Sequence, residues 1–428
     1  MYLLYSLLLS LGLGAMLPLF WLRNAPDGRY TRFLGERLGG LAPLAAPGAI
    51  WVHAVSVGEA LAVERLIAQL QLRFPDRPVV LSVTTAAGRA LAERRIGAAR
   101  IFYFPLDFRM AARRSLRALH PALVLITETE IWPNFLRAAA QDGIPVMFLN
   151  GRISGRSFAR YQMIRRLLRP VLQPVRAFLM QTATDAERVL ALGAAPERVQ
   201  VAGNLKFDLV PPERPGFVRW LAAELARAGI GEVVVAGSTM EGEEPLLLEA
   251  WQHLSRHDRL LVLAPRHPQR FAAVAALLAA SGLGWSRRSQ WKGEAEAQLP
   301  PGGVLLLDSL GELASAFELA TVAYVGGSLT PNGGHNLLEP AYWGVPLTFG
   351  PHMQNFAAIA EQFLAAGAAH EASSSFELER VWQRLLEDPE ERRRTGAAAR
   401  ALLASQRGAT ERALDAIAAV LQAVPNSG

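Results

Sequence analysis

Short apolar runs alternate with segments of helical periodicity along most of the chain. The first half contains apolar runs rich in Val, Ile, Leu and Phe, a composition typical of strands buried on both faces. The strands expected there are Ala49–His53, Val79–Val83, Ile101–Phe104, Leu123–Thr127, Pro145–Leu149 and Ala177–Gln181. Helical patterns lie between them at Ala60–Arg73, Ala86–Arg95 and Arg109–Leu119. This βαβα alternation predicts an α/β fold with a parallel sheet covered by helices on both faces.

A proline-rich break separates this half from a second alternation. Leu209–Phe217 contains three prolines and is interpreted as an interdomain linker. The strands expected after it are Glu232–Ala236, Leu260–Ala264, Val304–Leu307, Val322–Val325 and Pro346–Phe349. Glu377–Ala423, rich in Ala, Glu and Arg, is expected to be helical. The pattern predicts two Rossmann-like domains, 23–210 and 211–428, which face a cleft and place ligands at the carboxyl ends of their strands.

The amino-terminal segment differs from the rest in having no charge. Residues 2–22 are mostly leucine, and about twenty apolar residues are enough for a helix that spans a bilayer. Arginines follow the segment, which by the positive-inside rule puts the remainder on the cytoplasmic side. We therefore expect a membrane anchor at 1–22. The alternative is a buried or interfacial helix, because Pro18 and two glycines weaken a straight span.

Composition narrows the classes of function. The 428 residues include no cysteine, which excludes disulfides, thiolate metal sites and cysteine nucleophiles. The net charge of +6 comes almost entirely from arginine, because Lys206 and Lys292 are the only lysines. A phosphorylated substrate or an anionic membrane suits such a protein. Nucleic acid is the least favoured partner, because no zinc-finger, RNP or helix-turn-helix signature is present.

Glycines follow the expected strand Val322–Val325 and lead into a helical pattern. Gly326, Gly327, Gly333 and Gly334 stand here with His335 and Asn336, and Glu339 lies just inside the helical pattern. Glycines let backbone N–H groups approach a phosphate, and Glu339 can accept hydrogen bonds from ribose hydroxyls. This segment predicts a nucleotide-phosphate site, although a tight structural turn would look similar. No Gly-x-x-x-x-Gly-Lys-Ser/Thr loop occurs, which argues against ATP or GTP hydrolysis.

Other polar residues follow the remaining strands. In the second half, Ser238 is either a helix cap or a ligand group, and Arg266 is either a phosphate ligand or a solvated turn residue. The candidates of the first half are Ser56, Gly58, Glu128, Glu130, Arg152 and Lys206. Two glutamates beside Ile131 and Trp132 are costly to bury unless they are used or paired. All of these candidate residues follow strands, which is the position expected of side chains that share a binding cleft.

Taken together, these strings resemble the bacterial Kdo (3-deoxy-D-manno-octulosonic acid) transferases of lipopolysaccharide assembly. The matching strings are Gly35–Arg37, Trp51–Glu59, Glu128–Asn134, Asn150–Ser154, Gly203–Asp208, Gly237–Glu244, Pro265–Pro268, Asp308–Leu313, Gly326–Pro340 and Gly350–His352. They follow the family order over nearly the whole chain. Two positions depart from the pattern: Gly151 stands where alanine is expected, and Met240 where histidine is expected.

The resemblance implies a GT-B glycosyltransferase fold and inversion of the anomeric configuration. It implies CMP-Kdo as donor substrate, no permanently bound cofactor or metal, and a lipid A precursor (lipid IVA) as acceptor at the cytoplasmic face of the inner membrane. Glu36 matches the family's general base, although composition alone would make it a solvated acid beside Arg37. Glu128 and Glu130 match an acidic acceptor-side motif, with Ser56, Gly58, Arg152 and Lys206 as acceptor-binding residues. Ser238, Arg266, Gly333, Gly334, His335, Asn336 and Glu339 would bind the nucleotide sugar.

Three other functions remain open at this point. The first is another GT-B transferase that uses a UDP-sugar on a lipid acceptor. The second is a sugar-nucleotide epimerase or hydrolase, which shares the fold. The third is a membrane-tethered nucleotide-binding module without catalysis. Fold alone does not separate these functions.

Overall fold

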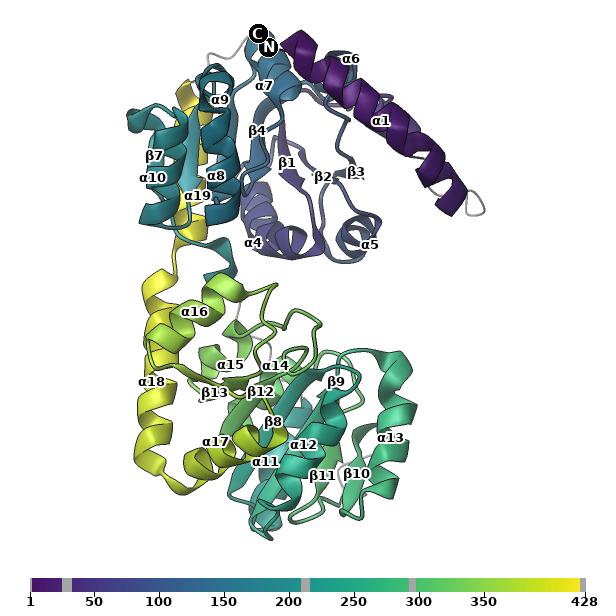
Figure 1. Ribbon diagram of the computed structural model, residues 1–428, viewed down its shortest axis with the longest axis vertical. Coiled ribbons are helices and arrows are strands. Elements are labelled where there is room, and N and C mark those ends of the chain that lie inside the picture. The colour runs from purple at the N-terminus through teal and green to yellow at the C-terminus, as the bar shows by residue number, and fades with distance from the viewer. Residues whose placement is uncertain (1, 25–32, 209–215, 292–297, 424–428) are drawn as a thin grey trace. The chain divides into compact units, whose positions relative to one another are not determined.

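The computed structural model describes residues 2–24, 33–208, 216–291 and 298–423, and it divides the chain into two compact units (Figure 1). Unit 1 comprises Met1–Asp208 together with Gln406–Gly428, and unit 2 comprises Leu209–Ser405. Each unit contains one seven-stranded sheet in which every pair of neighbouring strands is parallel. Of the expected linker Leu209–Phe217, residues 209–215 lie outside the described residues, and Gly216 and Phe217 are instead the first residues of helix α11 (Gly216–Arg227).

The sheet of unit 1 has the order β3-β2-β1-β4-β5-β6-β7. Its strands are β1 Ala49–Ala54, β2 Val79–Val83, β3 Arg100–Tyr103, β4 Pro121–Thr127, β5 Val146–Gly151, β6 Ala177–Met180 and β7 Val199–Val201. Its helices are α1 Tyr2–Asn24, α3 Leu34–Arg37, α4 Val57–Arg73, α5 Ala86–Arg95, α6 Arg109–Leu119, α7 Pro133–Gln141, α8 Gly155–Met163, α9 Arg165–Leu172, α10 Ala183–Leu192 and α19 Ala409–Ala423. Short 3-10 turns, η2 Pro196–Arg198 and η3 Leu205–Phe207, flank β7.

The sheet of unit 2 has the order β10-β11-β9-β8-β12-β13-β14, which differs from that of unit 1 because β11 lies between β10 and β9. Its strands are β8 Glu232–Thr239, β9 Arg259–Pro265, β10 Trp285–Arg287, β11 Val304–Leu306, β12 Val322–Val325, β13 Leu347–Phe349 and β14 Ala369–Glu371. Its helices are α11 Gly216–Arg227, α12 Glu243–Gln252, α13 Phe271–Ala280, α14 Leu313–Ala316, α15 Leu338–Trp343, α16 Ala357–Ala365, α17 Ser375–Glu387 and α18 Pro389–Gln406. The 3-10 turns are η4 Pro268–Arg270, η5 Arg288–Gln290 and η7 Phe317–Leu319.

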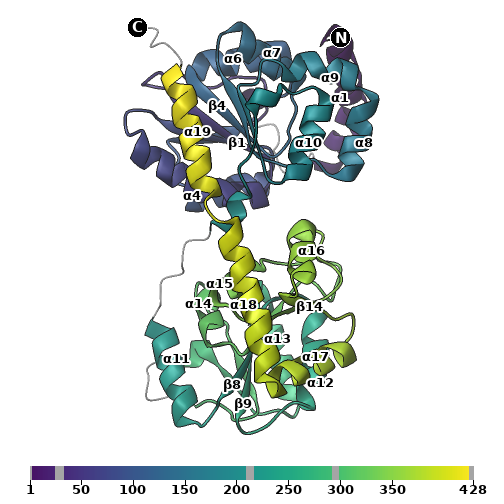
Figure 2. The ribbon, with the colours of Figure 1, turned by 90° about the vertical axis from the view of Figure 1, so that its left-hand side faces the viewer.

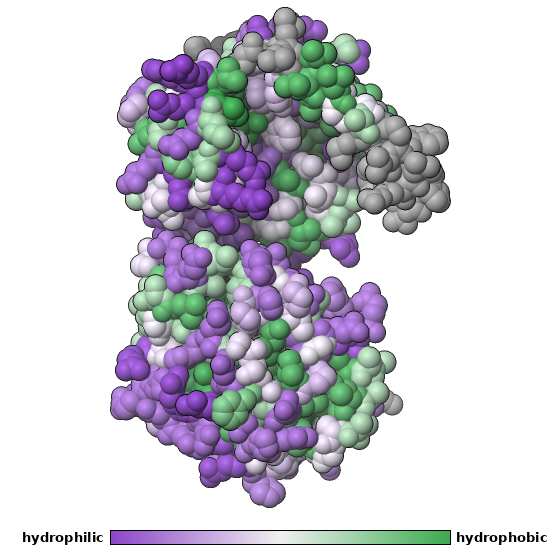
Figure 3. Space-filling model, in the orientation of Figure 1, coloured by the Kyte–Doolittle hydropathy of each residue, from purple (hydrophilic) through white to green (hydrophobic). Residues whose placement is uncertain are grey.

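Burial on both faces explains why the strands are continuously apolar. Along β1, Ile50 and Val52 pack in one hydrophobic cluster with α4 and α19, whereas Trp51 packs in the other with α6 and α7. Every residue of β1 is buried. The predicted parallel sheet with helices on both faces is confirmed for each unit (Figures 1 and 2). Hydrophilic side chains interspersed with apolar ones form the visible outer surface of both units (Figure 3).

In each sheet the chain reverses its direction of winding beside the first strand. From β1 the chain proceeds outward through β2 and β3, and then returns to place β4 on the other side of β1. In unit 2 the same step places β12 beside β8. Ligands of doubly wound sheets bind at this switch point, outside the carboxyl ends of the strands. The candidate residues that end β8 or follow β1, β4, β9 and β12 lie at those ends.

The carboxyl-terminal helix belongs to unit 1, whereas the sequence pattern had assigned it to the second domain. Ala413, Leu414 and Ile417 of α19 are buried in the same cluster as α4. Asp208 fixes the start of α19, because its carboxylate accepts hydrogen bonds from Gly408 N at 2.7 Å and Thr410 N at 2.5 Å. The helical pattern of Glu377–Ala423 gives no indication of which sheet its last turns cover.

Helix α1 is packed on unit 1 through polar contacts near its start. The hydroxyl of Tyr5 hydrogen-bonds to Asp107, and Asn134 Nδ2 donates to Ser6 Oγ at 2.9 Å. Asp107 in turn accepts the backbone N–H groups of Asn134 and Phe135 at the start of α7. Within the described residues, no helix is long and apolar enough to cross a membrane. The structure thus gives a helix at the expected place but no membrane-spanning segment among those residues.

Candidate active site

Backbone strain marks the carboxyl ends of the central strands. Among the described residues, four non-glycine residues have positive φ, and three of them directly follow or end a strand: Glu128 after β4, Asn150 in β5 and Ser238 in β8. Left-handed backbone costs a non-glycine residue on the order of 1 kcal/mol or more, and such residues cluster at functional sites. The strain therefore lies at the edges where the sequence places its candidates.

Glu59 is the buried centre of the carboxyl edge in unit 1. It lies in the first turn of α4, and its carboxylate accepts from Val55 N at 2.9 Å and Ser56 Oγ at 2.9 Å. Thr127 Oγ1, at the end of β4, lies 2.8 Å from Glu59 Oε2. Ser56 also caps α4 by accepting the Glu59 N–H. One carboxylate thus joins the end of β1, the start of α4 and the end of β4.

The acidic pair Glu128 and Glu130 lies beside Glu59 and titrates abnormally. Burial raises the pKa of Glu128, and the charge of Glu59 adds to this increase, while Lys206 and Arg152 oppose it. Burial, followed by the charges of Glu59 and Glu128, raises the pKa of Glu130 to about 7. Near neutral pH the edge therefore holds a carboxyl group that can both bind and release a proton, which suits acid–base work or hydrogen bonding to an acidic ligand.

Lys206 is fixed by hydrogen bonds that join three strand ends. Asn150 Oδ1 accepts Leu205 N at 2.9 Å, and Asn204 caps η3 by accepting Lys206 N. Gln181 Nε2 donates to Asn150 O. Burial and Arg152 lower the pKa of Lys206, while Glu128 and Glu59 act against this. The predicted residues Ser56, Gly58, Glu128, Glu130, Arg152 and Lys206 are thus brought to one edge of unit 1.

Glu36 occupies a separate position at the β3 end of the same edge. It lies on the short helix α3, and its Oε2 accepts from Arg89 Nη1 at 2.7 Å and from Tyr103 N at 2.9 Å. The Arg89 guanidinium also lies over the Phe33 ring. Three strand spacings separate β3 from β4, which corresponds to about 14 Å. Glu36 and the Glu128–Glu130 pair therefore lie at the ends of different strands of this edge.

Sequence reasoning missed Arg89, the partner that orients Glu36. Arg89 lies in α5, between Glu36 and Glu93, and pairs with both carboxylates. The pattern of α5 shows only a solvated arginine next to apolar residues, and nothing in it indicates a contact 53 residues away in sequence. The pairing also replaces the solvated Glu36–Arg37 pair that composition alone suggests, because Arg37 donates instead to Thr84 O.

In unit 2 a single buried glutamate shapes the glycine loop. Glu243, in the first turn of α12, accepts the backbone N–H groups of Gly327, Ser328 and Leu329 at 2.7–2.9 Å. It also accepts from Met240 N and the Tyr324 hydroxyl. Gly326 and Gly350 contact Ser238 and Ser328 backbone atoms so closely that neither position has room for a Cβ. The glycines are therefore required by close backbone packing as well as by any ligand.

The other candidates of unit 2 surround this loop. Gly333 and Gly334 have positive φ and lie against Asn355 and Met353, while Gly334 N donates to Gly327 O. Burial, then Arg266 and His267, lowers the pKa of His335 to about 4, so its ring is neutral at physiological pH. Within the described part of the chain, His335 Nε2 is a buried polar atom that lacks a hydrogen-bond partner. A neutral ring of this kind can donate to, or accept from, a bound ligand.

Asn336 and Glu339 lie where the helix after the loop begins. Asn336 Oδ1 accepts Leu338 N at 3.1 Å, and its Nδ2 donates to Glu339 Oε1 at 3.2 Å. Helix α15 begins at Leu338 and contains six residues, so any phosphate would rely on glycine N–H groups and Arg266 more than on a long helix dipole. Arg266 follows β9 with an exposed side chain, and its N–H donates to Thr239 O.

Some strong contacts near the site have structural roles. Glu244 forms a two-pronged ion pair with Arg270 and accepts from Thr239 Oγ1, which links α12 to η4. Asp308 holds Ser289 through its backbone N–H at 2.8 Å and its hydroxyl at 2.6 Å. The described residues contain no group of three or more His, Cys, Asp or Glu side chains that could hold a metal ion.

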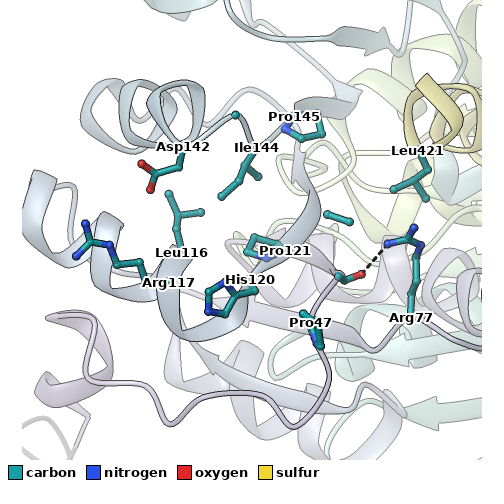
Figure 4. A pocket seen from close by; sticks show the side chains of 13 residues that line it. Pro47, Arg77, Leu116, Arg117, His120, Pro121, Asp142, Ile144, Pro145 and Leu421 are labelled. Carbon is teal, nitrogen blue, oxygen red and sulfur yellow. Dashed lines mark hydrogen bonds between the residues drawn. The ribbon is translucent and has the colours of Figure 1, made fainter. Parts of the chain in front are cut away.

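A pocket of about 550 Å³ lies at the opposite edge of the unit 1 sheet, where β4 begins and α6 and α7 end (Figure 4). Arg77, Arg117 and His120 line it, and Arg77 donates to Gly48 O at 3.2 Å. The carbonyl ends of helices carry partial negative charge, which opposes an anionic ligand. None of the candidate residues lines this pocket.

Comparisons with known proteins show which family the chain belongs to. A family profile described as 3-deoxy-D-manno-octulosonic-acid transferase (kdotransferase) matches residues 32–209. The 3-deoxy-D-manno-octulosonic acid transferase of Bordetella pertussis is 39% identical over 433 residues, which cover 95% of this chain and 97% of that protein. The chain belongs to the Kdo transferase family. It is therefore a glycosyltransferase.

Solved structures with low sequence identity show the same fold as this Kdo transferase. The UDP-GlcNAc 2-epimerase of Neisseria meningitidis, 13% identical, covers 87% of this chain and all of its own, with a TM-score of 0.55. The glycotransferase of kitacinnamycin, 18% identical, covers 88% of this chain and all of its own, with a TM-score of 0.52. These likenesses support the predicted GT-B-like architecture of two α/β units, and nothing about substrate.

Proposed function

We propose that the protein is an inverting transferase that moves Kdo from CMP-Kdo to a lipid A precursor of the lipid IVA type, with Glu36 as general base. The observation that carries the base assignment is the position of the Glu36 carboxylate. Arg89 and Tyr103 N fix one of its oxygens, and its side chain remains about a quarter exposed. A carboxylate that is oriented and accessible fits the role of accepting a proton from an acceptor hydroxyl.

In the proposed reaction the acceptor hydroxyl oxygen forms a bond to the anomeric carbon of Kdo. The bond from that carbon to the CMP phosphate oxygen breaks, the bonding pair leaves with CMP, and Glu36 receives the hydroxyl proton. CMP carries a single phosphate, so its departure does not demand a metal ion to bridge a diphosphate. Donors from Arg266 and the Gly333–Asn336 loop would stabilise the charge on the leaving phosphate, and Glu339 would bind the ribose.

The acceptor is expected at the acidic edge of unit 1. Lys206 and Arg152 supply positive charge there for the phosphates of a lipid A precursor. The Ser56 hydroxyl donates its proton to Glu59, so toward the acceptor it would accept a hydrogen bond. Glu130, with a pKa of about 7, can hydrogen-bond as a neutral acid or accept as an anion. Because about 14 Å of sheet separates it from Glu36, its role would be binding and charge balance near the acceptor.

We also propose that the protein works at the cytoplasmic face of the inner membrane, with α1 in the lipid interface. Leu7, Leu8 and Leu11 of α1 are 56–61% exposed, while Tyr5 and Ser6 face the protein. Nearby α7 places the Arg137 guanidinium over the Tyr2 ring, and α6 carries four arginines. An exposed leucine stripe with adjacent arginines suits an anionic bilayer surface.

The decisive experiment compares the wild type with Glu36→Gln. Purified full-length protein is incubated with CMP-Kdo and a tetraacylated lipid A precursor in anionic vesicles, and mass spectrometry counts the Kdo residues on the lipid. We expect Glu36→Gln to lower kcat by about 10²–10⁴-fold with unchanged thermal unfolding. Glu93→Gln, which removes the other partner of Arg89, is the matched control and should retain most activity.

Three outcomes would contradict all or part of the proposal. Wild-type protein that leaves the lipid unmodified but is thermally stabilised by a UDP-sugar would favour a different transferase. Consumption of a nucleotide sugar without any acceptor would favour an epimerase or hydrolase. Full activity in Glu36→Gln, with Kdo on the lipid, would reject Glu36 as the base while leaving the transferase function in place.

A further inference from the structure

Glu59 is a buried carboxylate that the proposed reaction leaves without a role. Its residue is 8% exposed, and its partners are Val55 N, Ser56 Oγ and Thr127 Oγ1. A capping glutamate needs only the first turn of its own helix. Glu59 extends beyond that turn to the end of the neighbouring strand, and Thr127 is the residue directly before Glu128.

The charges around Glu59 are unusual for a purely structural residue. Within the part of the chain that the structure describes, no arginine or lysine forms an ion pair with it. The titratable groups that face this corner are Glu128 and Glu130 after β4, Tyr161 on α8, Lys206 on η3 and Arg152 after β5. Three carboxylates thus share two cations, and burying them together opposes full ionisation.

The geometry connects Glu59 to the loop Glu128–Glu130 through a short path. The Thr127 hydroxyl lies 2.8 Å from the Glu59 carboxylate and 2.9 Å from His53 O. The backbone of Glu128 that follows is left-handed, and its N–H donates to Leu149 O at 2.8 Å. A shift of Thr127 therefore moves the loop Glu128–Glu130. We propose that Glu59 is a positioning residue of the transfer reaction, which fixes this loop at the end of β4 and sets its charge. The inference rests on the proposed function.

Two consequences separate this role from simple stabilisation. First, the negative charge of Glu59 favours a proton on its neighbours, so Glu59→Gln should lower the pKa of Glu130 from about 7. Any limb of the pH–rate profile that Glu130 controls then moves to lower pH, whether activity needs the neutral or the ionised form. Second, Thr127→Val removes the hydroxyl but keeps the charge, so it should slow the reaction without moving that limb.

The test measures Kdo transfer to the lipid A precursor from pH 5.5 to 9 for the wild type, Glu59→Gln and Thr127→Val. Glu64→Gln, on the same helix and paired at the surface with Arg95, is the control. We expect Glu59→Gln to lower kcat about tenfold and to shift the limb by about one pH unit, with KM for CMP-Kdo unchanged. Infrared titration of the carboxyl band that Glu130→Gln removes gives the same shift without relying on activity.

The outcomes distinguish the inference from the function on which it rests. If the wild type transfers no Kdo, the proposed function fails, yet the infrared shift still tests the effect of Glu59 on Glu130. If the wild type is active, and Glu59→Gln and Thr127→Val both have the same kcat and the same pH profile as the wild type, the inference is overturned. Lost stability in Glu59→Gln without any shift in profile or carboxyl band would overturn it too, since that is the result of a structural role. Should Glu59→Gln not fold, an unaltered kcat in Thr127→Val rejects the positioning path.

Discussion

Glu59 in unit 1 and Glu243 in unit 2 occupy equivalent positions but have different partners. Each lies in the first turn of the helix that follows the central strand, and each reaches the strand beyond the switch point, β4 in one unit and β12 in the other. Glu243 accepts four backbone N–H groups and a phenol hydroxyl. Glu59 accepts one backbone N–H group and contacts two side-chain hydroxyls.

The difference shows that a glutamate in the first turn of the helix after the first strand can have two different roles. In unit 2, Glu243 binds the backbone N–H groups of Gly327, Ser328 and Leu329, and the loop that follows contains Gly333, Gly334 and a neutral His335. In unit 1 the glutamate stands among other ionisable groups, so its charge changes their protonation. A glutamate at this position thus binds backbone N–H groups in unit 2 and changes the protonation of neighbouring side chains in unit 1.

The largest effect is expected from removing the unit 2 glutamate. Glu243→Ala leaves several buried backbone N–H groups without an acceptor, and each costs about 1–3 kcal/mol. We expect unit 2 to lose at least about 4 kcal/mol of stability, and donor binding to disappear with the loop. Urea unfolding followed by hydrogen exchange of peptides from β8 and β12 measures the loss. Glu249→Ala, an exposed site on the same helix, should change little.

A small loss in that experiment would break the comparison. If β12 peptides of Glu243→Ala are protected as in the wild type, the glycine loop holds its shape without its acceptor. Glu243 would then not be required for the shape of the unit 2 loop, and the contrast between Glu243 and Glu59 would be lost. The geometry of the loop would instead depend on the close packing of Gly326 and Gly350.

An intermediate effect is expected from pH, through the buried histidines of the two units. His53 in β1 is fully buried, stacks on Phe104, and burial lowers its pKa to about 3. As pH falls below about 6.5, His53 becomes protonated in the unfolded chain but stays neutral in the folded protein. The free energy of unfolding of unit 1 therefore decreases by up to about 1.4 kcal/mol per pH unit, down to about pH 3. His53→Asn, which can keep the bond made by Nδ1, should remove this dependence.

Hydrogen exchange of β1 peptides at pH 7, 6 and 5 measures the effect in unit 1. His335→Asn should remove a smaller dependence from unit 2, because its ring is only half-buried and its pKa is about 4. Parallel stability curves for wild type and His53→Asn would show that another group dominates acid unfolding of unit 1.

Much of this architecture could be predicted because its signals are local. Continuous apolar runs gave the central strands, and Ser56 with Glu59 three residues later is a capping-box signature. The short edge strands β10 and β14 are half-exposed and lack such runs, so no pattern predicted them. The return of α19 to unit 1 depends on Asp208, which is 200 residues from Gly408 in sequence.

The same distinction between local patterns and long-range contacts applies to the site residues. Glycines and acids directly after strands were predictable, because strand ends in a parallel sheet meet at one edge. The roles of Glu36 came from family resemblance, and its partner Arg89 required the three-dimensional structure. Glu243 looked like one of several acids in a capped helix start, since a glutamate that binds backbone N–H groups 84–86 residues away leaves no local pattern.

The smallest expected effect comes from a glycine substitution, and it compares Gly58 in unit 1 with Gly350 in unit 2. A Cβ at Gly58 would have Ser56 Oγ at 3.9 Å as its nearest neighbour, whereas Gly350 in unit 2 has no room for one. Gly58→Ala in the first turn of α4 should therefore stabilise unit 1 by about 0.5 kcal/mol. If Gly58 lets the acceptor approach the backbone, KM for the lipid should rise a few-fold while stability increases. A gain in thermal stability with unchanged KM would make Gly58 a helix residue only, in contrast to Gly350, whose close backbone contacts leave no room for a side chain.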